Sequence, residues 1–109
     1  MKLSLNTISK NVTVAGTPEA LSASVLHTPV AQIQAKLTNT DTIYVGISGL
    51  NKATLANCAI TLEPGDVWNL NAVLGNQHGG DILDLSTIYI DADVSGNGVL
   101  VAYYKRVNL

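Results

Sequence analysis

The sequence predicts an all-β fold: a single-domain antiparallel β-sandwich, jelly-roll-like, with roughly seven to nine short strands. Short apolar or alternating segments are separated by turn residues at intervals of roughly 8–12 residues, a spacing typical of sandwiches and small barrels. No window of about a dozen residues shows helical periodicity with caps, which argues against α/β architectures. The 109 residues can bury one core. An immunoglobulin-like Greek key is the second choice, although a single cysteine cannot supply its paired cysteines.

The N-terminal segment alternates only weakly. Residues 1–10 are expected to form either an N-terminal arm that orders on a partner or a first strand, and residues 11–109 the β-sandwich domain. The alternation is clearest at 30–37, where Ala31, Ile33 and Ala35 share one face and glutamines the other, so this strand should be buried on one side. Short strands are predicted at 11–15, 19–24, 30–37, 43–47, 58–62 and 66–71.

The C-terminal stretch 85–104 is predicted to be a β-hairpin. Its first half alternates, and its second half, 99–104, is apolar on both faces, as expected for a strand that is covered on both sides. The intervening Ser95-Gly96-Asn97-Gly98 suits a tight turn, with a positive φ expected at Gly98. Loops are expected at 48–57, with one helical turn near 52–55, and at 73–84.

Charge is scarce in this chain. Charged residues make up 13% of the sequence, against about 25% in a typical domain, and the net charge is −2. Neutral polar side chains cost less to desolvate than charged ones, which favours packing against other subunits, with a neutral monomer as the alternative. Because no basic residue lies between Lys52 and Lys105, no stripe can follow a phosphate backbone, and we expect no direct nucleic-acid binding.

No segment of the sequence indicates membrane insertion or secretion. No apolar run approaches the length of a membrane span, and the opening residues lack the apolar core of a secretory signal. We therefore expect a protein without a membrane partner that is made in the cytoplasm. Cys58, the single cysteine, cannot form an intrachain disulfide, and its apolar surroundings predict an inert buried thiol.

The sharpest local motif, Asp91-Ala-Asp93-Val-Ser95-Gly96, resembles the start of an EF-hand loop. The twelfth position, where a bidentate carboxylate is needed, is Ala102, and both flanks are predicted strands rather than helices. A turn is therefore the preferred interpretation. A looser calcium site formed by Asp91, Asp93 and Asn97 stays open as an alternative.

Other candidate groups lack the partners that their chemistry needs. These are a base and carboxylate at His78 and Asp81, a pair of histidines at His27 and His78, a carboxylate pair at Glu63 and Asp66, and an aromatic sugar platform from Trp68, Tyr44, Tyr89, Tyr103 and Tyr104. Neither a nucleophile elbow nor a zinc ligand set accompanies them, and no phosphate-binding glycine loop is present. The sequence predicts no catalytic, cofactor-binding or metal-binding residue, and hence not an enzyme.

Four segments together resemble small β-sandwich virion proteins of tailed bacteriophages. They are Ala35-Lys-Leu-Thr-Asn-Thr-Asp-Thr-Ile-Tyr-Val-Gly46, Leu62-Glu-Pro-Gly-Asp66, Asp84-Leu-Ser-Thr-Ile-Tyr-Ile-Asp-Ala-Asp93 and the closing Gly98-Val-Leu-Val-Ala-Tyr-Tyr104. The resemblance covers residues 10–105, nearly the whole chain. It implies a non-enzymatic structural protein and supplies no catalytic residue or cofactor.

The resemblance implies a head decoration, or cement, subunit that stabilises the capsid shell. Its expected partners are the major capsid protein and further copies of itself, as a homo-oligomer expected to be a trimer. Its expected location is the capsid surface of the virion. The alternative that the resemblance leaves open is a tail, baseplate or fibre module, with host-glycan binding through Tyr and Trp side chains as one role.

Overall fold

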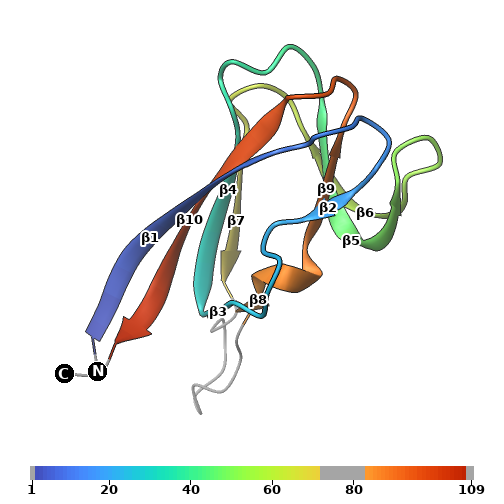
Figure 1. Cartoon of the computed structure of the whole chain (residues 1–109). Helices are drawn as coiled ribbons and strands as arrows, with labels where there is room; N and C mark the ends of the chain where they lie inside the picture. Colours follow the sequence, from blue (N-terminus) through green and yellow to red (C-terminus); the bar gives the residue numbers. More distant parts are fainter. Residues whose placement is uncertain (1, 72–82, 108–109) are drawn as a thin grey trace.

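The computed structural model describes residues 2–71 and 83–107 and consists mainly of two four-stranded antiparallel sheets that pack face to face (Figure 1). A single 3₁₀ turn, η1, occurs among the described residues, and none of their helices has the length and hydropathy needed to span a membrane. The strands are β1 Lys2–Asn11, β2 Glu19–Ala20, β3 His27–Thr28, β4 Val30–Ala35, β5 Ile43–Asn51, β6 Ala56–Leu62, β7 Val67–Asn71, β8 Leu83–Asp84, β9 Tyr89–Ala92 and β10 Gly98–Val107, and η1 is Leu85–Thr87.

The strand order is that of a jelly roll. Sheet A has the order β1-β10-β4-β7, sheet B has the order β2-β9-β5-β6, and the two-residue strands β3 and β8 form a small third sheet. In the two main sheets the first strand pairs with the last, the second with the seventh, the third with the sixth and the fourth with the fifth. This nested pairing is that of a long hairpin rolled into a sandwich. The predicted all-β, jelly-roll-like sandwich is confirmed, although the described residues form ten strands, eight of them in the two main sheets, where seven to nine were predicted.

The core lies between the two main sheets. Ile33 of β4 and Val101 of β10 face Val45 of β5 and Ile90 of β9, and each is at most 1% exposed. Burying one such side chain stabilises the fold by about 1.5–3 kcal/mol. Ile33 and Val101 alternate with exposed or half-buried neighbours along their strands, as the period of two in the sequence predicted, whereas in sheet B the neighbours Gly46 and Asp91 are buried as well.

An ion pair links the two sheets where β1 and β2 meet. Lys10 Nζ of β1 lies 3.1 Å from Glu19 Oε1 of β2, and the backbone N–H of Thr13 donates to Glu19 Oε2 at 2.6 Å. The Thr13 N–H is the main cause that lowers the pKa of Glu19 below its ordinary value, and Lys10 adds to the effect. These polar contacts therefore connect sheet A to sheet B at this side of the sandwich.

The predicted C-terminal hairpin is wrong. Strand β9 belongs to sheet B and pairs with β2 and β5, whereas β10 belongs to sheet A and pairs with β1 and β4. The turn at 93–97 therefore crosses from one sheet to the other. The apolar face of β9 and the apolar face of β10 therefore pack against each other across the core, instead of lying side by side in one sheet. Two sheets that pack face to face bury both of these faces.

The turn glycine is also reassigned. The positive φ lies at Gly96 (φ 92°) and not at Gly98. Gly98 is required for a different reason: an added Cβ would collide with the backbone of Lys10 and with Asn11, whose Cα would lie 2.7 Å away. The close approach of two backbones, rather than a left-handed conformation, excludes a side chain at this position.

Several predicted boundaries are also wrong. The strand predicted at 11–15 is absent, because β1 ends at Asn11 and the following residues form turns. Most of the loop predicted at 48–57 belongs to β5 and β6, which leave only 52–55 as their connecting turn. Much of the loop predicted at 73–84 lies outside the described residues, and its last two residues form β8.

Strands β1 and β10 form a two-stranded ribbon that extends beyond the rest of sheet A (Figure 1). Their pairing runs without a register shift from Asn11↔Gly98 to Lys2↔Val107, but β4 pairs with β10 only over Val99–Tyr103. The ribbon lengthens the molecule to 42 Å, against 26 and 23 Å in the other directions. Of the two alternatives for the N-terminal segment, the structure has a strand, and half of it projects.

Candidate interaction surface

The outer face of sheet A, the side turned away from the core, is built from cross-strand rows. One row pairs Thr7, Ala102, Gln32 and Asn69, and the next pairs Ser9, Leu100, Gln34 and Val67. These eight residues, one pair from each of four strands, are called the outer face below. Residues paired across antiparallel strands point to the same side, so the rows form one continuous surface. None of the eight side chains carries a charge, and the ammonium at the border of this face is that of Lys36, whose Nζ donates to Ser9 Oγ at 2.7 Å.

The apolar members of this face are well exposed. Leu100 is 46% exposed and Val67 is 44% exposed, whereas their neighbours Val99 and Val101 are fully buried on the other side of the sheet. The sequence predicted a strand covered on both sides at 99–104. In the single chain only the inner side of β10 is buried. The apolar residues on its outer side are therefore exposed, although the sequence pattern predicts that they are buried too.

A shallow hollow of about 310 Å³ lies on this face. It is lined by Thr7 of β1, Gln32 and Gln34 of β4, and Leu100 and Ala102 of β10. The Gln34 side chain is held by a hydrogen bond that its Nε2 donates to the carbonyl oxygen of Gly65 at 3.3 Å. The hollow therefore offers an apolar floor with amide groups at its side, which suits a neutral side chain or a backbone segment of a partner.

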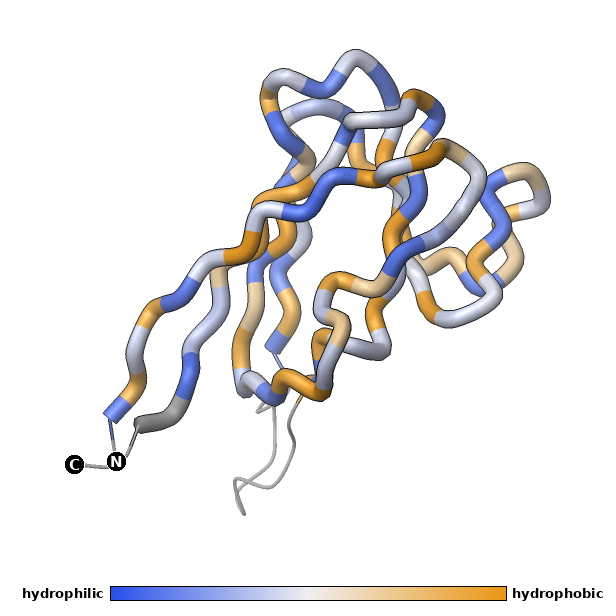
Figure 2. Tube along the Cα trace, viewed as in Figure 1, coloured by the Kyte–Doolittle hydropathy of each residue, from blue (hydrophilic) through white to orange (hydrophobic). Residues whose placement is uncertain are grey.

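Charged residues are unevenly distributed along the long axis of the molecule, although Lys10, Lys36 and Lys52 lie near the loop end, where Lys52 contacts Asp93. The four described strands of sheet A contain no Asp or Glu, and three of their four basic residues, Lys2, Lys105 and Arg106, lie in the last residues of the ribbon. Acidic residues gather in the loops at the opposite end of the strands: Asp41, Glu63, Asp66 and Asp93. The colouring of Figure 2 shows how apolar and polar residues alternate along the ribbon between these two ends.

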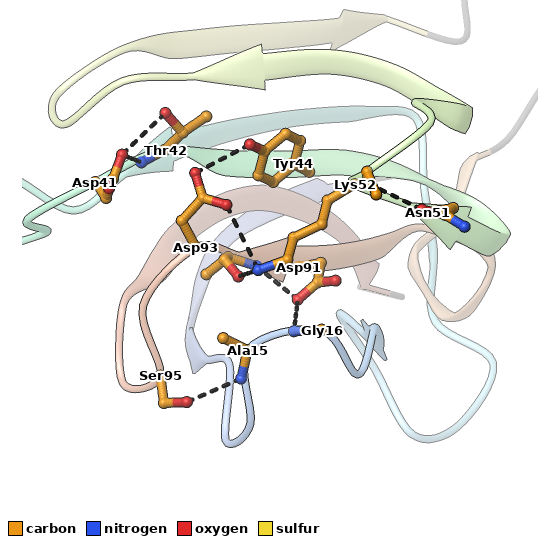
Figure 3. A network of polar contacts seen from close by, with 12 residues as sticks. Ala15, Gly16, Asp41, Thr42, Tyr44, Asn51, Lys52, Asp91, Asp93 and Ser95 are labelled. Atoms are coloured by element: carbon orange, nitrogen blue, oxygen red, sulfur yellow. Dashed lines mark hydrogen bonds and ion pairs between the residues drawn. The ribbon is translucent and has the colours of Figure 1, made fainter.

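The predicted calcium ligands are engaged in protein contacts at the acidic end (Figure 3). Buried Asp91 accepts hydrogen bonds from the backbone N–H of Gly16 at 2.9 Å and of Ala92 at 2.7 Å. Asp93 accepts a hydrogen bond from the Tyr44 hydroxyl at 3.0 Å, and its Oδ1 lies 3.5 Å from Lys52 Nζ. Within residues 2–71 and 83–107, no cluster of three or more His, Cys, Asp or Glu is placed to hold a metal.

These contacts give the acidic residues structural roles. Asp91 fixes the loop between β1 and β2 against sheet B through Gly16, 75 positions away in the chain. Burial is the main cause that raises the pKa of Tyr44 above its ordinary value, and the hydrogen bond to Asp93 raises it further. The third predicted ligand, Asn97, is buried, and its side-chain oxygen accepts hydrogen bonds from the backbone N–H groups of Thr40 and Asp41, each at 3.1 Å.

The other predicted groups are dispersed. His78 and Asp81 lie outside the described residues. Glu63 and Asp66 share the turn between β6 and β7, where the Glu63 N–H donates to Asp66 Oδ2 at 3.0 Å. His27 lies 3.9 Å from Asp84, which caps η1 by accepting hydrogen bonds from Ser86. Cys58 is half-buried.

The aromatic residues do not share one face. Trp68 packs against the core from β7, Tyr103 is 9% exposed within the core, and Tyr44 joins the Asp93 network. Of these aromatic residues, Tyr104, on the outer side of the ribbon, is the exposed one, at 40% exposed, and Tyr89 is half-buried. The structure therefore does not assemble the predicted aromatic platform from them.

Sequence reasoning missed the outer face as a unit. Its rows combine residues near positions 7, 32, 69 and 102, which no local pattern connects. A usable signal was present: no acidic residue precedes Glu19 or follows Asp93, so the two longest strands of one sheet lack negative charge. Comparisons of this chain with protein-family models, with curated proteins and with solved structures give no match.

Proposed function

We propose that this protein is a structural subunit of a tailed-bacteriophage virion, a capsid decoration protein that binds the major capsid protein through the outer face of sheet A. The observation that carries the proposal is the uncharged outer face with its exposed Leu100 and Val67. The phage-like segments of the sequence and the jelly-roll strand order support it. A cement subunit needs a surface that is cheap to desolvate, and neutral side chains meet that need.

The size of the outer face indicates how such a subunit binds. Four strands about 4.8 Å apart and about five residues long at 3.3 Å per residue present roughly 300 Å². A stable pairwise interface buries about 800 Å² on each partner. One outer face alone is therefore expected to bind the shell weakly, and linked copies that engage several sites would bind more tightly through avidity.

The experiment compares two charge insertions on opposite sides of the sandwich. Gln32→Glu places a carboxylate in the middle of the outer face, and Thr61→Glu places one on the exposed side of β6 in sheet B. Purified variants are mixed with capsids stripped of the protein, and the bound fraction is measured by sedimentation. Burying an unpaired carboxylate should weaken binding by Gln32→Glu at least about tenfold, while Thr61→Glu binds normally.

Electron microscopy of whole virions provides the second arm. Density for the chain on the head shell supports the proposal. Absence of the chain from the shell and its presence in the tail would reject the decoration role in favour of a tail, baseplate or fibre module. Equal shell binding by both charge variants would reject the outer face as the contact.

A further inference from the structure

We propose that two copies of this chain associate by antiparallel pairing of β1 with β1, which joins their A sheets into one eight-stranded sheet. The contact uses residues 2–8 of β1, of which residues 2–5 lie beyond the part of the ribbon that β4 flanks, and it has a two-fold axis at Leu5. The inference stands apart from the proposed function, because it concerns the edge of β1 and not the outer face.

Strand β1 is the one long and regular edge among the described strands. It has ten residues, pairs only with β10 among those strands, and carries no charge between Lys2 and Lys10. The other edges are protected: β2 has two residues and follows Pro18, β6 has register shifts against β5, and β7 has five residues. Proteins commonly shorten, bulge or charge an edge strand to prevent pairing, and β1 lacks these features along its middle.

The backbone of β1 offers hydrogen-bonding groups on its open side. The N–H and C=O of Gly98 both bond to β4-side groups, the Asn39 side chain and the Lys36 N–H, so Gly98 turns away from its partner Asn11. In an antiparallel ladder such non-bonded pairs alternate with bonded ones. With no register shift in β1, every second residue before Asn11, including Thr7, Leu5 and Leu3, directs its N–H and C=O to the open edge.

The register centred on Leu5 pairs the open backbone groups of β1 and also brings apolar side chains together. It places Leu5 opposite Leu5 and Leu3 opposite Thr7, with about six backbone hydrogen bonds from three bonded pairs. Leu5 is 64% exposed, Leu3 is 47% exposed, and Tyr104 lies opposite Leu5 on the same side of the ribbon. The two-fold axis therefore gathers these apolar side chains from both copies into one patch.

Neighbouring registers are less favourable. A register centred on Asn6 places Lys2 opposite Lys10 twice, which opposes like charges. A register centred on Thr7 sets Leu5 opposite Ser9, beside Lys10 and its ion pair with Glu19, where the body of the sandwich begins. Figure 1 shows the ribbon projecting away from the rest of the sandwich, so a contact centred on Leu5 would leave the two sandwiches at opposite ends of the joined sheet.

The first test is the mass of the purified protein by sedimentation equilibrium, with a dimer as the expected result. Leu5→Lys places two lysines face to face at the axis and should raise the dimer dissociation constant at least about tenfold. Leu37→Lys is the matched control, because Leu37 is 78% exposed in the loop after β4, away from the ribbon. A monomer at every soluble concentration, a trimer as expected from the sequence, or equal weakening by both variants would overturn the pairing.

The second test is cross-linking, which reports the register. In a Cys58→Ser background, Leu5→Cys brings two Cα atoms about 5.5 Å apart, within the range that a disulfide spans, whereas Leu3→Cys faces Thr7. Mild oxidation should give a covalent dimer of Leu5→Cys and leave Leu3→Cys largely monomeric. Equal cross-linking of the two, or none of Leu5→Cys, would overturn the register. Gln32 lies outside this contact, so the effect of Gln32→Glu on shell binding tests the proposed function independently of the dimer.

Discussion

Single residues of this protein are constrained by close backbone approaches and by caps more than by unusual dihedral angles. At Gly98 the constraint is the backbone of Lys10 and Asn11 in the neighbouring strand, and at Gly96 it is a positive φ with open space around the Cα. The sequence shows both glycines in one turn but not which of the two faces a second strand. That difference arises because β1, which supplies the obstacle, lies some ninety positions away.

These two glycines give the first prediction. Gly98→Ala should lower the free energy of unfolding by roughly 1–3 kcal/mol, because its Cβ overlaps backbone atoms of β1. Gly96→Ala meets no neighbouring atom within 4 Å and should lower it by about 1 kcal/mol through strain alone. Denaturant unfolding measures both, and a Gly98→Ala variant as stable as the parent protein would contradict the close approach.

The second prediction concerns the pH dependence of stability. Hydrogen bonds from the Ser86 hydroxyl and N–H lower the pKa of Asp84 below its ordinary value of 3.8, with a smaller effect of Leu26 N–H and His27. A lowered folded pKa means that Asp84 stabilises the fold above its ordinary pKa and that this stabilisation is lost as the pH falls through the folded value.

Asp84→Asn should therefore flatten the fall in stability at acid pH and lower the stability at neutral pH. Urea unfolding followed from pH 7 to acid conditions measures the slope. Thr61→Asn, on the exposed side of β6, is the control that should keep the parent slope. An unchanged slope in Asp84→Asn would show that this carboxylate does not contribute.

At the scale of elements, the sequence predicts faces better than partners. The alternation at 30–37 predicted the buried side of β4, and Ile33 and Ala35 are indeed fully buried. The same kind of pattern at 85–104 led to a hairpin that does not exist, because turn residues look alike whether they close one ladder or cross between two sheets. Strand β1 alternates weakly because half of it projects beyond the core that would select apolar residues.

The connection between β5 and β6 gives the third prediction. Leu55 has φ 63° and Asn57 has φ 57°, both in the left-handed region that leucine adopts only at a cost. Leu55→Gly should stabilise the protein by roughly 0.5 kcal/mol, since glycine has no such cost and Leu55 is half exposed. Leu37→Gly, an exposed leucine without a positive φ, should bring no gain in the same thermal unfolding measurement.

At the scale of the whole molecule, charge and apolar surface are distributed unevenly over the two sheets. Sheet A combines an uncharged outer face, a long open edge at β1 and a basic ribbon end, while acidic residues gather at the loop end. The low charge of the sequence predicts that part of the protein surface packs against other subunits. Which surface it is could not be predicted, because the rows of the outer face are created only when strands from distant parts of the chain pair.

The fourth prediction tests most directly the proposal that the outer face of sheet A is covered in an assembled virion. In a Cys58→Ser background, Gln32→Cys places a thiol on the outer face and Thr61→Cys places one on the exposed side of sheet B. Both thiols should react with a water-soluble maleimide in the free protein. In virions, Gln32→Cys should be protected while Thr61→Cys stays reactive. Equal labelling of the two in particles that carry the chain would contradict the account.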